Sequence, residues 1–348
     1  MKLALKELKF YKFKYIMVTA ILFLLAFLVL FVSALAQGLA RENISGIEAL
    51  DSEYFVIEED VENDLMRSRL SEDQVDAVEV TTSATPLKLS MQKIESGDSE
   101  ISLLIAATDQ SKQPAVKEGS FPKSQSELLL NEKLKAEGFS VGDDVTLTDE
   151  QTYEVSGFAE DIMFAHNSMA FMTPEAINEL DSRTAALIIG DSSEAERQTI
   201  EDASGVAMVS ASELKNAVPS YQAEQQPLNL MIVFLFVISA IVLAAFFYVI
   251  TIQKTSQFGI LKAIGTSSRT LAVSILIQVI LITLTGVVLS LISISVIGMI
   301  IPIDMPFYLN TNLMALVSAL FLVVAFIGAG LSLVRVIRID PLEAISSE

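Results

Sequence analysis

Four runs of apolar residues, each long enough to cross a lipid bilayer as a helix, set the strongest limit on how this chain can fold. They are Tyr15–Ala36, Leu228–Ile252, Leu271–Ile301 and Leu313–Val334. A helix needs about 20 such residues to span a hydrocarbon layer roughly 30 Å thick. Hydrophobic residues make up 52% of the chain, yet its formal net charge is −20, so charged and apolar residues must occupy separate segments. The sequence therefore predicts four transmembrane helices and a separate, acidic domain.

The first apolar run is interpreted as a retained helix rather than a cleaved signal peptide. It exceeds the roughly 7–15 residues of a signal peptide's apolar region, and "SALAQGLA" is a weak cleavage site. The chain contains no Cys, which excludes disulfides and thiolate metal sites.

The distribution of Lys and Arg predicts one orientation in the membrane. Basic residues flank the apolar runs at three places: Lys2, Lys6, Lys9, Lys12 and Lys14, then Lys254, Lys262 and Arg269, and finally Arg335 and Arg338. The segment 38–227, by contrast, holds 38 acidic and 13 basic residues. Because loops rich in Lys and Arg stay inside, we expect both termini and the loop 253–270 in the cytoplasm, and 38–227 outside.

The segment 38–227 is long enough for one folded domain. Runs rich in β-branched and aromatic residues predict strands: "EYFVIEED", "QVDAVEVTTS", "DDVTLTDE", "TYEVSGFA" and "TAALIIGD". Between them, "SQSELLLNEKLKAEGF" predicts a helix with Ser126 as its N-cap and Gly138 near its end. We therefore expect an α+β domain.

The order of motifs in this segment resembles the extracytoplasmic domain of MacB-type ABC transporter permeases. The stretch "FPKSQSELLLNEKLKAEGFSVGDDVTLTDEQTYEVSGF" carries that resemblance, "FGILKAIGTSSRTL" is similar to the cytoplasmic loop of the MacB and FtsX families, and "IDPLEAI" is similar to their usual ending. Within this superfamily, "FVSALAQGLARENIS", "SYQAEQQPLNLMIV", "FFYVITIQKTSQFGILKAIG", "MPFYL" and the start "MKLALKELKFYKFKY" resemble the haem-efflux permeases. The resemblance implies a multi-pass protein of the bacterial plasma membrane with a 1+3 arrangement of helices. It also implies a homodimer that works with two copies of a cytosolic ABC ATPase.

These expectations divide the chain into nine segments. They are a cytoplasmic amphipathic segment 1–14, transmembrane helix 15–37, extracytoplasmic α+β domain 38–227, transmembrane helix 228–252, cytoplasmic coupling loop 253–270, transmembrane helix 271–301, short outer loop 302–312, transmembrane helix 313–334 and cytoplasmic tail 335–348. The lysines of 1–14 favour an interfacial helix that anchors the first span, with a contribution to ATPase docking as the alternative.

The loop 253–270 is the predicted contact with the ATPase. If it is helical, Phe258, Ile260, Leu261 and Ile264 lie close together, and Lys262 points elsewhere. Gly259 and Gly265 indicate a close approach or a helix end. The resemblance implies a coupling helix, and a basic helix lying on the inner leaflet is the alternative. The chain lacks the glycine-rich loop with Lys-Ser/Thr that holds nucleotide phosphates, so we expect no enzymatic activity and ATP-Mg bound on a separate subunit.

The cargo implied by the resemblance is haem or another porphyrin, carried as substrate rather than as a resident cofactor. Tyr221, Glu224 and Met231 share one face of a helix by their spacing, and each is a candidate ligand of the haem iron. Arg41 and Glu42 leave the first span at the same side of the membrane, with Arg41 placed for a propionate. Ordinary membrane-boundary chemistry is the alternative for all five residues.

His166, the single histidine, is the alternative iron ligand. It lies in the methionine-containing stretch "DIMFAHNSMAFM". A structural role is the alternative, since methionines at such spacing usually pack a core.

The resemblance thus implies the permease of a haem-detoxifying exporter that works by mechanotransmission from its ATPase. Two other functions stay open. One keeps the architecture with a peptide, antibiotic or lipid as cargo. The other is an FtsX-like protein that transports nothing and signals to a cell-wall hydrolase.

Overall fold

The computed structural model describes residue 7 and residues 9–79, 84–96, 99–109, 112–148, 150–189, 197–198, 200 and 205–337. The chain forms two compact units. The helical unit contains residues 1–37, 227–301 and 307–348, and the sheet unit contains residues 38–226 and 302–306. The expected tail motif "IDPLEAI" and two of the predicted cytoplasmic lysines, Lys2 and Lys6, lie outside the described residues.

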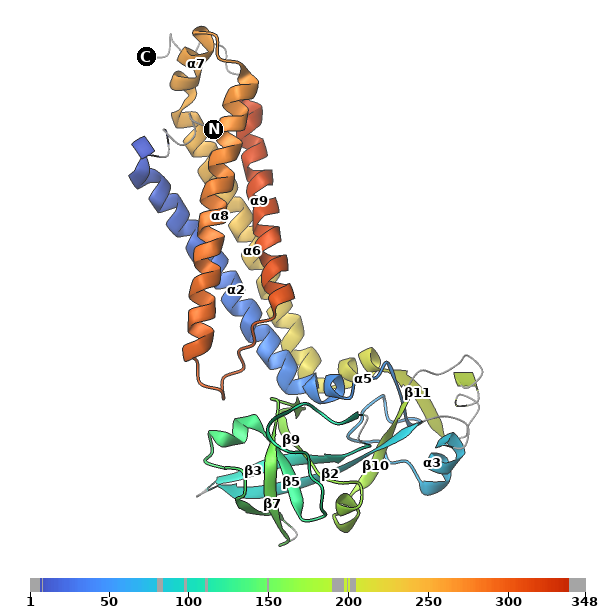
Figure 1. The fold of residues 1–348 in the computed structure, drawn as a ribbon. Helices are drawn as coiled ribbons and strands as arrows, with labels where there is room; N and C mark the ends of the chain where they lie inside the picture. The colour runs from blue at the N-terminus through green and yellow to red at the C-terminus, as the bar shows by residue number, and fades with distance from the viewer. Residues whose placement is uncertain are drawn as a thin grey trace. The chain divides into compact units, whose positions relative to one another are not determined.

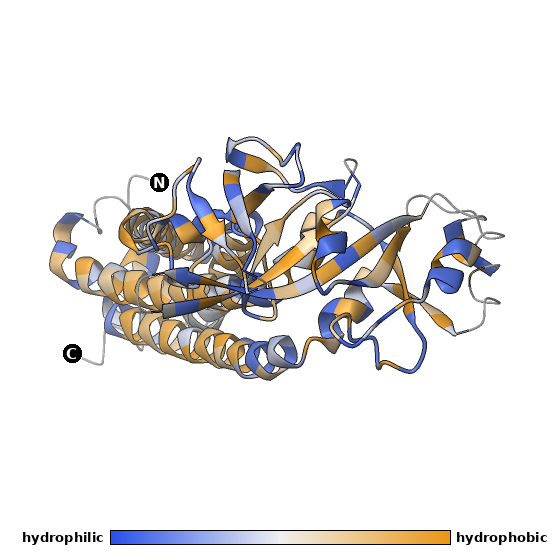
Figure 2. Cartoon of the chain, turned by 90° about the horizontal axis from the view of Figure 1, so that it is seen from below, coloured by the Kyte–Doolittle hydropathy of each residue, from blue (hydrophilic) through white to orange (hydrophobic). Residues whose placement is uncertain are grey.

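Four long helices make up most of the helical unit, and each is long and apolar enough to cross a membrane. They are α2 (Lys12–Ala49), α6 (Pro219–Gln253), α8 (Ser268–Ile300) and α9 (Thr311–Ile337). Their middle parts run side by side in Figure 1, and the apolar residues along them are orange in Figure 2. The short helix α7 (Thr255–Ala263) lies between α6 and α8 in the chain.

Small residues allow the helices of this unit to approach closely. A Cβ atom added at Gly328 of α9 would lie 3.2 Å from the backbone of Ala244 in α6, so only a glycine fits there without a shift. Gly330 has no such neighbour within 4 Å. Of these two glycines, Gly328 alone makes a close helix contact, of the kind that brings transmembrane helices together.

The sheet unit is built on one mixed sheet. Among the described residues its central path runs β11-β1-β10-β2-β3-β9-β5-β7-β4, with β6 paired to β7 and β8 paired to β9. The strands are β1 (Tyr54–Glu58), β2 (Thr85–Ser96), β3 (Ser99–Ala107), β4 (Val116–Gly119), β5 (Glu127–Asn131), β6 (Asp144–Thr146), β7 (Thr152–Ala159), β8 (Met163–Phe164), β9 (Asn167–Phe171), β10 (Arg183–Ile189) and β11 (Val206–Ser210). Helices α3 (Glu72–Glu79) and α5 (Ala211–Ala217) and the short 3₁₀ helices η2 (Glu132–Lys135) and η3 (Ala176–Glu179) complete the unit.

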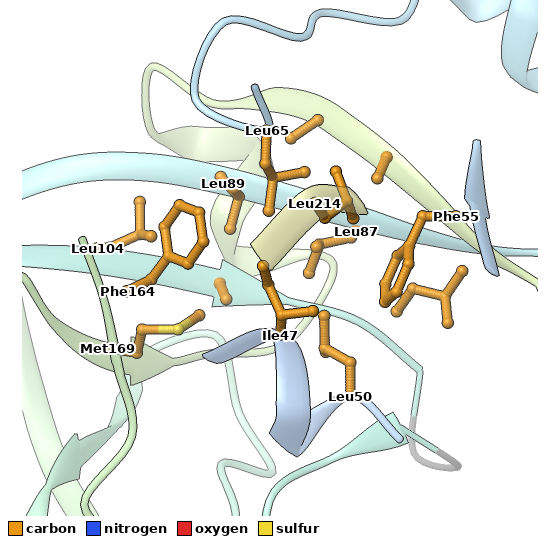
Figure 3. Close-up of a cluster of buried hydrophobic side chains, with 14 of the residues drawn as sticks. Ile47, Leu50, Phe55, Leu65, Leu87, Leu89, Leu104, Phe164, Met169 and Leu214 are labelled. Atoms are coloured by element: carbon orange, nitrogen blue, oxygen red, sulfur yellow. The ribbon is translucent and has the colours of Figure 1, made fainter. Parts of the chain in front are cut away.

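Both faces of the central strands are buried. In β3, Leu104 belongs to one hydrophobic cluster, whereas Leu103 and Ile105 belong to the cluster on the other face. The first cluster includes Ile47 of α2 and Leu214 of α5 (Figure 3). The last turns of α2 are therefore part of the core of the sheet unit.

Two sequence-based assignments in this unit are wrong. The stretch expected as the helix "SQSELLLNEKLKAEGF" forms strand β5 followed by η2. Leu128 and Leu130 pack on one face of the sheet and Leu129 on the other, so burial on both faces overrides the helical propensity of leucine. The side chain of Asn131, not Ser126, caps the 3₁₀ helix that follows.

The second wrong assignment is the strand expected in "QVDAVEVTTS". Residues Glu72–Glu79 form helix α3, and 80–83 lie outside the described residues. Ser71 and Gln74 bond reciprocally as a capping box, with Gln74 N donating to Ser71 Oγ over 3.3 Å and Ser71 N donating to Gln74 Oε1 over 2.9 Å. This local start signal outweighs the alternating valines. The expected strands at 54–58, 144–146, 152–159 and 183–189 are present.

Candidate functional site

The hairpin between β8 and β9 turns through two residues in a conformation that is unusual outside glycine. Ala165 has φ +46° and His166 has φ +61°. Positive φ at both central residues is what a tight type I′ hairpin requires, and Asn or Gly normally supplies it. Ala165 and His166 are two of seven described non-glycine residues with positive φ, a conformation that persists where surrounding contacts fix a residue in place.

The last turns of α2 supply those contacts. Ala165 N donates to Asn43 O over 3.1 Å, and His166 N donates to Glu42 O over 3.0 Å. Ser45 Oγ accepts from Met163 N over 2.8 Å. A Cβ at Gly46 would lie 2.4 Å from Met169 Sδ and 3.2 Å from Phe164 Cβ, so the hairpin lies directly on the helix.

Both nitrogens of the His166 ring face carboxylates. Nδ1 lies 3.3 Å from Glu42 Oε2 of α2, and Nε2 lies 2.9 Å from Glu224 Oε1 of α6. The second oxygen of Glu224 accepts from Asn43 Nδ2 over 3.0 Å. A protonated ring can donate to both carboxylates at once, whereas a neutral ring can donate to only one.

Lys133 extends this arrangement toward Arg41. Its Nζ lies 2.8 Å from Glu42 Oε1 and 3.6 Å from Asp161 Oδ2, with its own side chain 11% exposed. Arg41 Nη2 donates to the backbone oxygen of Asp161 over 3.2 Å. Burial raises the pKa of Asp161 above its ordinary value, and the charges of Lys133 and Arg41 act in the opposite direction. We call this group the histidine network: Arg41, Glu42, Asn43, Lys133, Asp161, His166 and Glu224.

The structure brings four of the predicted site residues into one network. Arg41, Glu42 and Glu224 lie in it together with His166, which the sequence offered only as a rival location. Tyr221 lies one helical turn before Glu224 and is half-buried against the hydrophobic core of the sheet unit. Met231 falls in the helical unit, where its side chain is 42% exposed, so it is not a member of this network.

Three members of the network, Asn43, Lys133 and Asp161, were not predicted as site residues, and the last two come from segments far from the predicted helix ends. Lys133 sits at the start of η2, in the stretch wrongly assigned to a longer helix, and Asp161 follows β7. Nothing in their local sequence marks them as site residues, because both reach the network through sheet pairing between distant segments.

A cavity of about 280 Å³ adjoins Arg41 within the sheet unit. Its polar lining includes Ser45, Glu48, Gln113 and Glu160. Arg41 thus faces a water-accessible space, as a partner for a carboxylate ligand must. Among the described residues no group of three His, Asp or Glu side chains is arranged to hold a bare metal ion.

The residues in and just after helix α7 that were expected to contact an ATPase fall into an exposed group and a buried group. Ile260 is 48% exposed and Ile264 is 75% exposed. Phe258 is buried in a hydrophobic cluster of the helical unit, against which Leu261 also packs. Gly259 is buried as well, and Lys262 is half-buried. The prediction that all four apolar residues form one common face is therefore wrong. The exposed apolar surface consists of Ile260 and Ile264.

Gly265 ends α7 by adopting φ +97°. Its N–H donates to Lys262 O over 3.0 Å, and Thr266 N donates to Leu261 O over 2.9 Å. This pair of bonds is the Schellman motif, in which glycine is preferred because its backbone tolerates positive φ. Gly265 therefore fixes the point at which the chain leaves α7, and with it the place of Ile264.

Comparison with known proteins adds the following similarities. The chain is 39% identical over 347 residues, 99% of each chain, to the protein named "Putative hemin transport system permease protein HrtB" in Staphylococcus haemolyticus. The protein of that name in Staphylococcus epidermidis is 38% identical over 346 residues, again 99% of each chain. Residues 229–341 match the family described as "FtsX-like permease C-terminal". The solved extracellular domain of the ABC-type transporter YknZ aligns at 10% identity with a TM-score of 0.34, covering 45% of this chain and 98% of that chain.

Proposed function

The chain belongs to the MacB/FtsX-like family of ABC transporter permeases, in the branch of the HrtB proteins, and we propose that it exports haem or a related porphyrin from the membrane. The observation that carries the proposal is identity of 39% over nearly the whole length to a protein named for hemin transport. Four helices long enough to cross a membrane support a multi-pass permease.

The proposed assembly is a homodimer with two cytosolic ABC ATPase subunits in a bacterial plasma membrane. The chain lacks a phosphate-binding loop of its own, so ATP-Mg binds on the partner subunits. The distribution of Lys and Arg supports cytoplasmic termini, a cytoplasmic α7 and an extracytoplasmic sheet unit. The exposed side chains of Ile260 and Ile264 are suited to a groove on the ATPase.

We assign porphyrin binding to the histidine network and the adjoining start of α6. Glu224 and Tyr221 are the proposed iron ligands in this unit, and Arg41 is the proposed partner of a propionate. Because Glu224 is bonded to His166 in this structure, binding at iron requires the carboxylate to leave the imidazole. His166 can then keep Glu42 as its partner, and Asn43 Nδ2 of α2 can stay bonded to the second oxygen of Glu224, so neither side chain is left without a partner. Met231 stays a sequence-based candidate.

The test is the absorption of the purified permease from haem-fed cells. We expect a Soret band in the parent protein and a shifted or missing band in Glu224→Gln, since changing an axial ligand changes the spectrum of the iron. Glu175→Gln, an exposed carboxylate of the same unit, is the matched control and should retain the parent spectrum. A permease without bound haem, in cells that it does not protect from haem, would contradict the proposal.

The match to FtsX-like permeases keeps a signalling function as the second candidate. A signal transmitter to a cell-wall hydrolase would leave haem tolerance unchanged on deletion and would alter cell separation instead. A peptide, antibiotic or lipid exporter would leave both unchanged and alter sensitivity to that compound.

A further inference from the structure

Lys254 is a buried cation at the joint between α6 and α7. Only 5% of the residue is exposed, and it occupies the N-cap position of α7. A positive charge is unfavourable at the N-terminus of a helix, where the backbone dipoles already point their positive ends. A lysine in this position therefore needs a specific partner.

Three side chains from three separate segments meet the Lys254 ammonium. It contacts the carboxylate of Glu7 over 2.5 Å and donates to the hydroxyl of Tyr15 in α2 over 2.7 Å and to Gln278 Oε1 in α8 over 3.2 Å. The partners also bond to one another. Gln278 Nε2 donates to Glu7 Oε2 over 2.9 Å, and the Tyr15 hydroxyl donates to Gln278 Oε1 over 2.6 Å. We call these four residues the Lys254 network.

Two further hydrogen bonds connect the same joint to the N-terminal segment. Gln257 of α7 donates to the hydroxyl of Tyr11 over 2.8 Å, and Lys14 of α2 donates to Gln253, the last residue of α6. The joint between α6 and α7 is thus bonded to residues 7–15 at four points.

The other side chains around Lys254 are mostly apolar and do little to stabilise its positive charge. A small cavity beside it is lined mainly by apolar side chains: Phe247, Ile250, Ile275, Val279 and Ile282. A buried polar network in such surroundings is costly when any member lacks its partner, so all of its members are expected to move together. Movement of α7 must then carry α2 and α8 with it.

From this geometry we infer that Lys254 is a positioning residue that transmits movement of α7 to the transmembrane helices α2 and α8 through Glu7, Tyr15 and Gln278. The inference rests on the proposed function, because it takes the movement of α7 to come from an ATPase. It assigns Lys254 no part in docking, which the exposed Ile260 and Ile264 provide.

The experiment compares Lys254→Met and Gln278→Leu with the parent permease, each reconstituted in lipid with its ATPase. Lys123→Met is the matched control, because it removes an exposed cation of the sheet unit, outside the loop 253–270. We expect both network variants to co-purify with the ATPase and to hydrolyse ATP, while the haem moved per ATP hydrolysed falls roughly tenfold. The double variant should be no worse than either single variant, since one network is lost in each case.

A charge exchange separates transmission from simple loss of stability. Glu7→Lys combined with Lys254→Glu restores an ion pair and places a carboxylate at the N-terminus of α7. We expect the pair to recover a substantial part of the coupling that either single change removes. Equal coupling in Lys254→Met and the parent protein, or loss of ATPase binding in Lys254→Met, would overturn the inference.

A second readout does not depend on the cargo. Because the chain has no Cys, a single cysteine at Glu175 of the sheet unit can carry a fluorophore without background labelling. ATP should change its fluorescence in the parent protein and in Lys123→Met, and not in Lys254→Met. If the parent responds to ATP but moves no haem, the proposed cargo fails while the inference is still tested. If Lys254→Met responds as the parent does, the inference fails whatever the cargo.

Discussion

His166 Nε2 lies 2.9 Å from Glu224 Oε1, although 57 residues separate the two in the sequence. The contact joins the strained turn of the β8–β9 hairpin to the first turns of α6, and Glu42 on the other ring nitrogen adds the last turns of α2. One imidazole therefore links the two segments of the sheet unit that continue into long apolar helices. A proton on that ring decides whether it can donate to both carboxylates at the same time.

This contact predicts that His166 restrains Glu224 rather than binding the iron. In His166→Ala the carboxylate of Glu224 loses its nearest partner, so haem affinity should stay the same or rise and the Soret maximum should not move. Titration of the detergent-solubilised permease with haem measures both quantities, with Glu224→Gln as the comparison. Loss of the parent spectrum in His166→Ala, with Glu224→Gln unaffected, would make His166 the ligand.

The sheet unit should be more stable without the membrane when the helix ends are kept. Residues 38–226 include Ile44 and Val218, which are 5% and 4% exposed in its core, and a fragment of 45–215 lacks both. Burial of one such side chain contributes about 1.5–3 kcal/mol, so the shorter fragment should be less stable by about 3–6 kcal/mol. Urea denaturation of the two fragments gives the difference. Equal midpoints would show that the helix ends do not contribute to this core.

The burial pattern in and next to α7 predicts that glutamate substitutions at an exposed and at a buried residue have different effects. Ile264→Glu places a charge on a side chain that is 75% exposed, so the permease should insert and fold normally but lose co-purification with the ATPase. Phe258→Glu would bury the charge in a hydrophobic cluster and should reduce the amount of folded permease instead. Retained ATPase binding in Ile264→Glu would point to the lipid surface as the partner of this helix.

The positive φ of Gly265 gives a backbone test of the same helix. Gly265→Ala should destabilise the end of α7 by about 1 kcal/mol, whereas Gly265→Asn should cost less because Asn tolerates the left-handed region. A Cβ meets nothing within 4 Å at this position, so any difference reports backbone conformation rather than a clash. ATPase activity that depends on the permease should follow the order Gly, Asn, Ala. The reverse order for Asn and Ala would argue against the left-handed cap.

Asp161 predicts how stability changes with pH. Burial raises its folded pKa above the ordinary value of 3.8, so the folded state holds this proton more tightly than the unfolded state does. The contribution of Asp161 to the stability of the fold is most favourable at low pH, where its carboxyl group is protonated in both the folded and the unfolded state. It becomes unfavourable as pH rises through the pKa of the unfolded state and then through the pKa of the folded state. Asp161→Asn should therefore gain stability relative to the parent fragment 38–226 as pH rises from about 3.5 to 7. The same exchange at exposed Asp76 is the control, and a gain that shrinks with rising pH would contradict the assignment.

The sequence alone was sufficient to place the four long apolar helices, because a run of about 20 apolar residues has few other ways to satisfy its backbone and its side chains. It was also sufficient to predict the strands at 54–58 and 183–189, because four of the five side chains in the first are β-branched or aromatic and the second ends in the apolar run Leu-Ile-Ile. It failed at Leu128–Leu130, since the same three leucines suit either a helix or a strand buried on both faces, and only their neighbours in the sheet decide between the two.

The tertiary structure decided the polar contacts. Glu42, Lys133, His166 and Glu224 come from four distant segments, and no local pattern predicts that an imidazole will lie between two carboxylates. Lys254 looked like one more cytoplasmic surface charge, yet folding buries it among Glu7, Tyr15 and Gln278. Hydrophobic length and strand propensity are summed along the chain and can be read from it, whereas an ion pair exists only where packing brings two particular side chains within a few ångströms of each other.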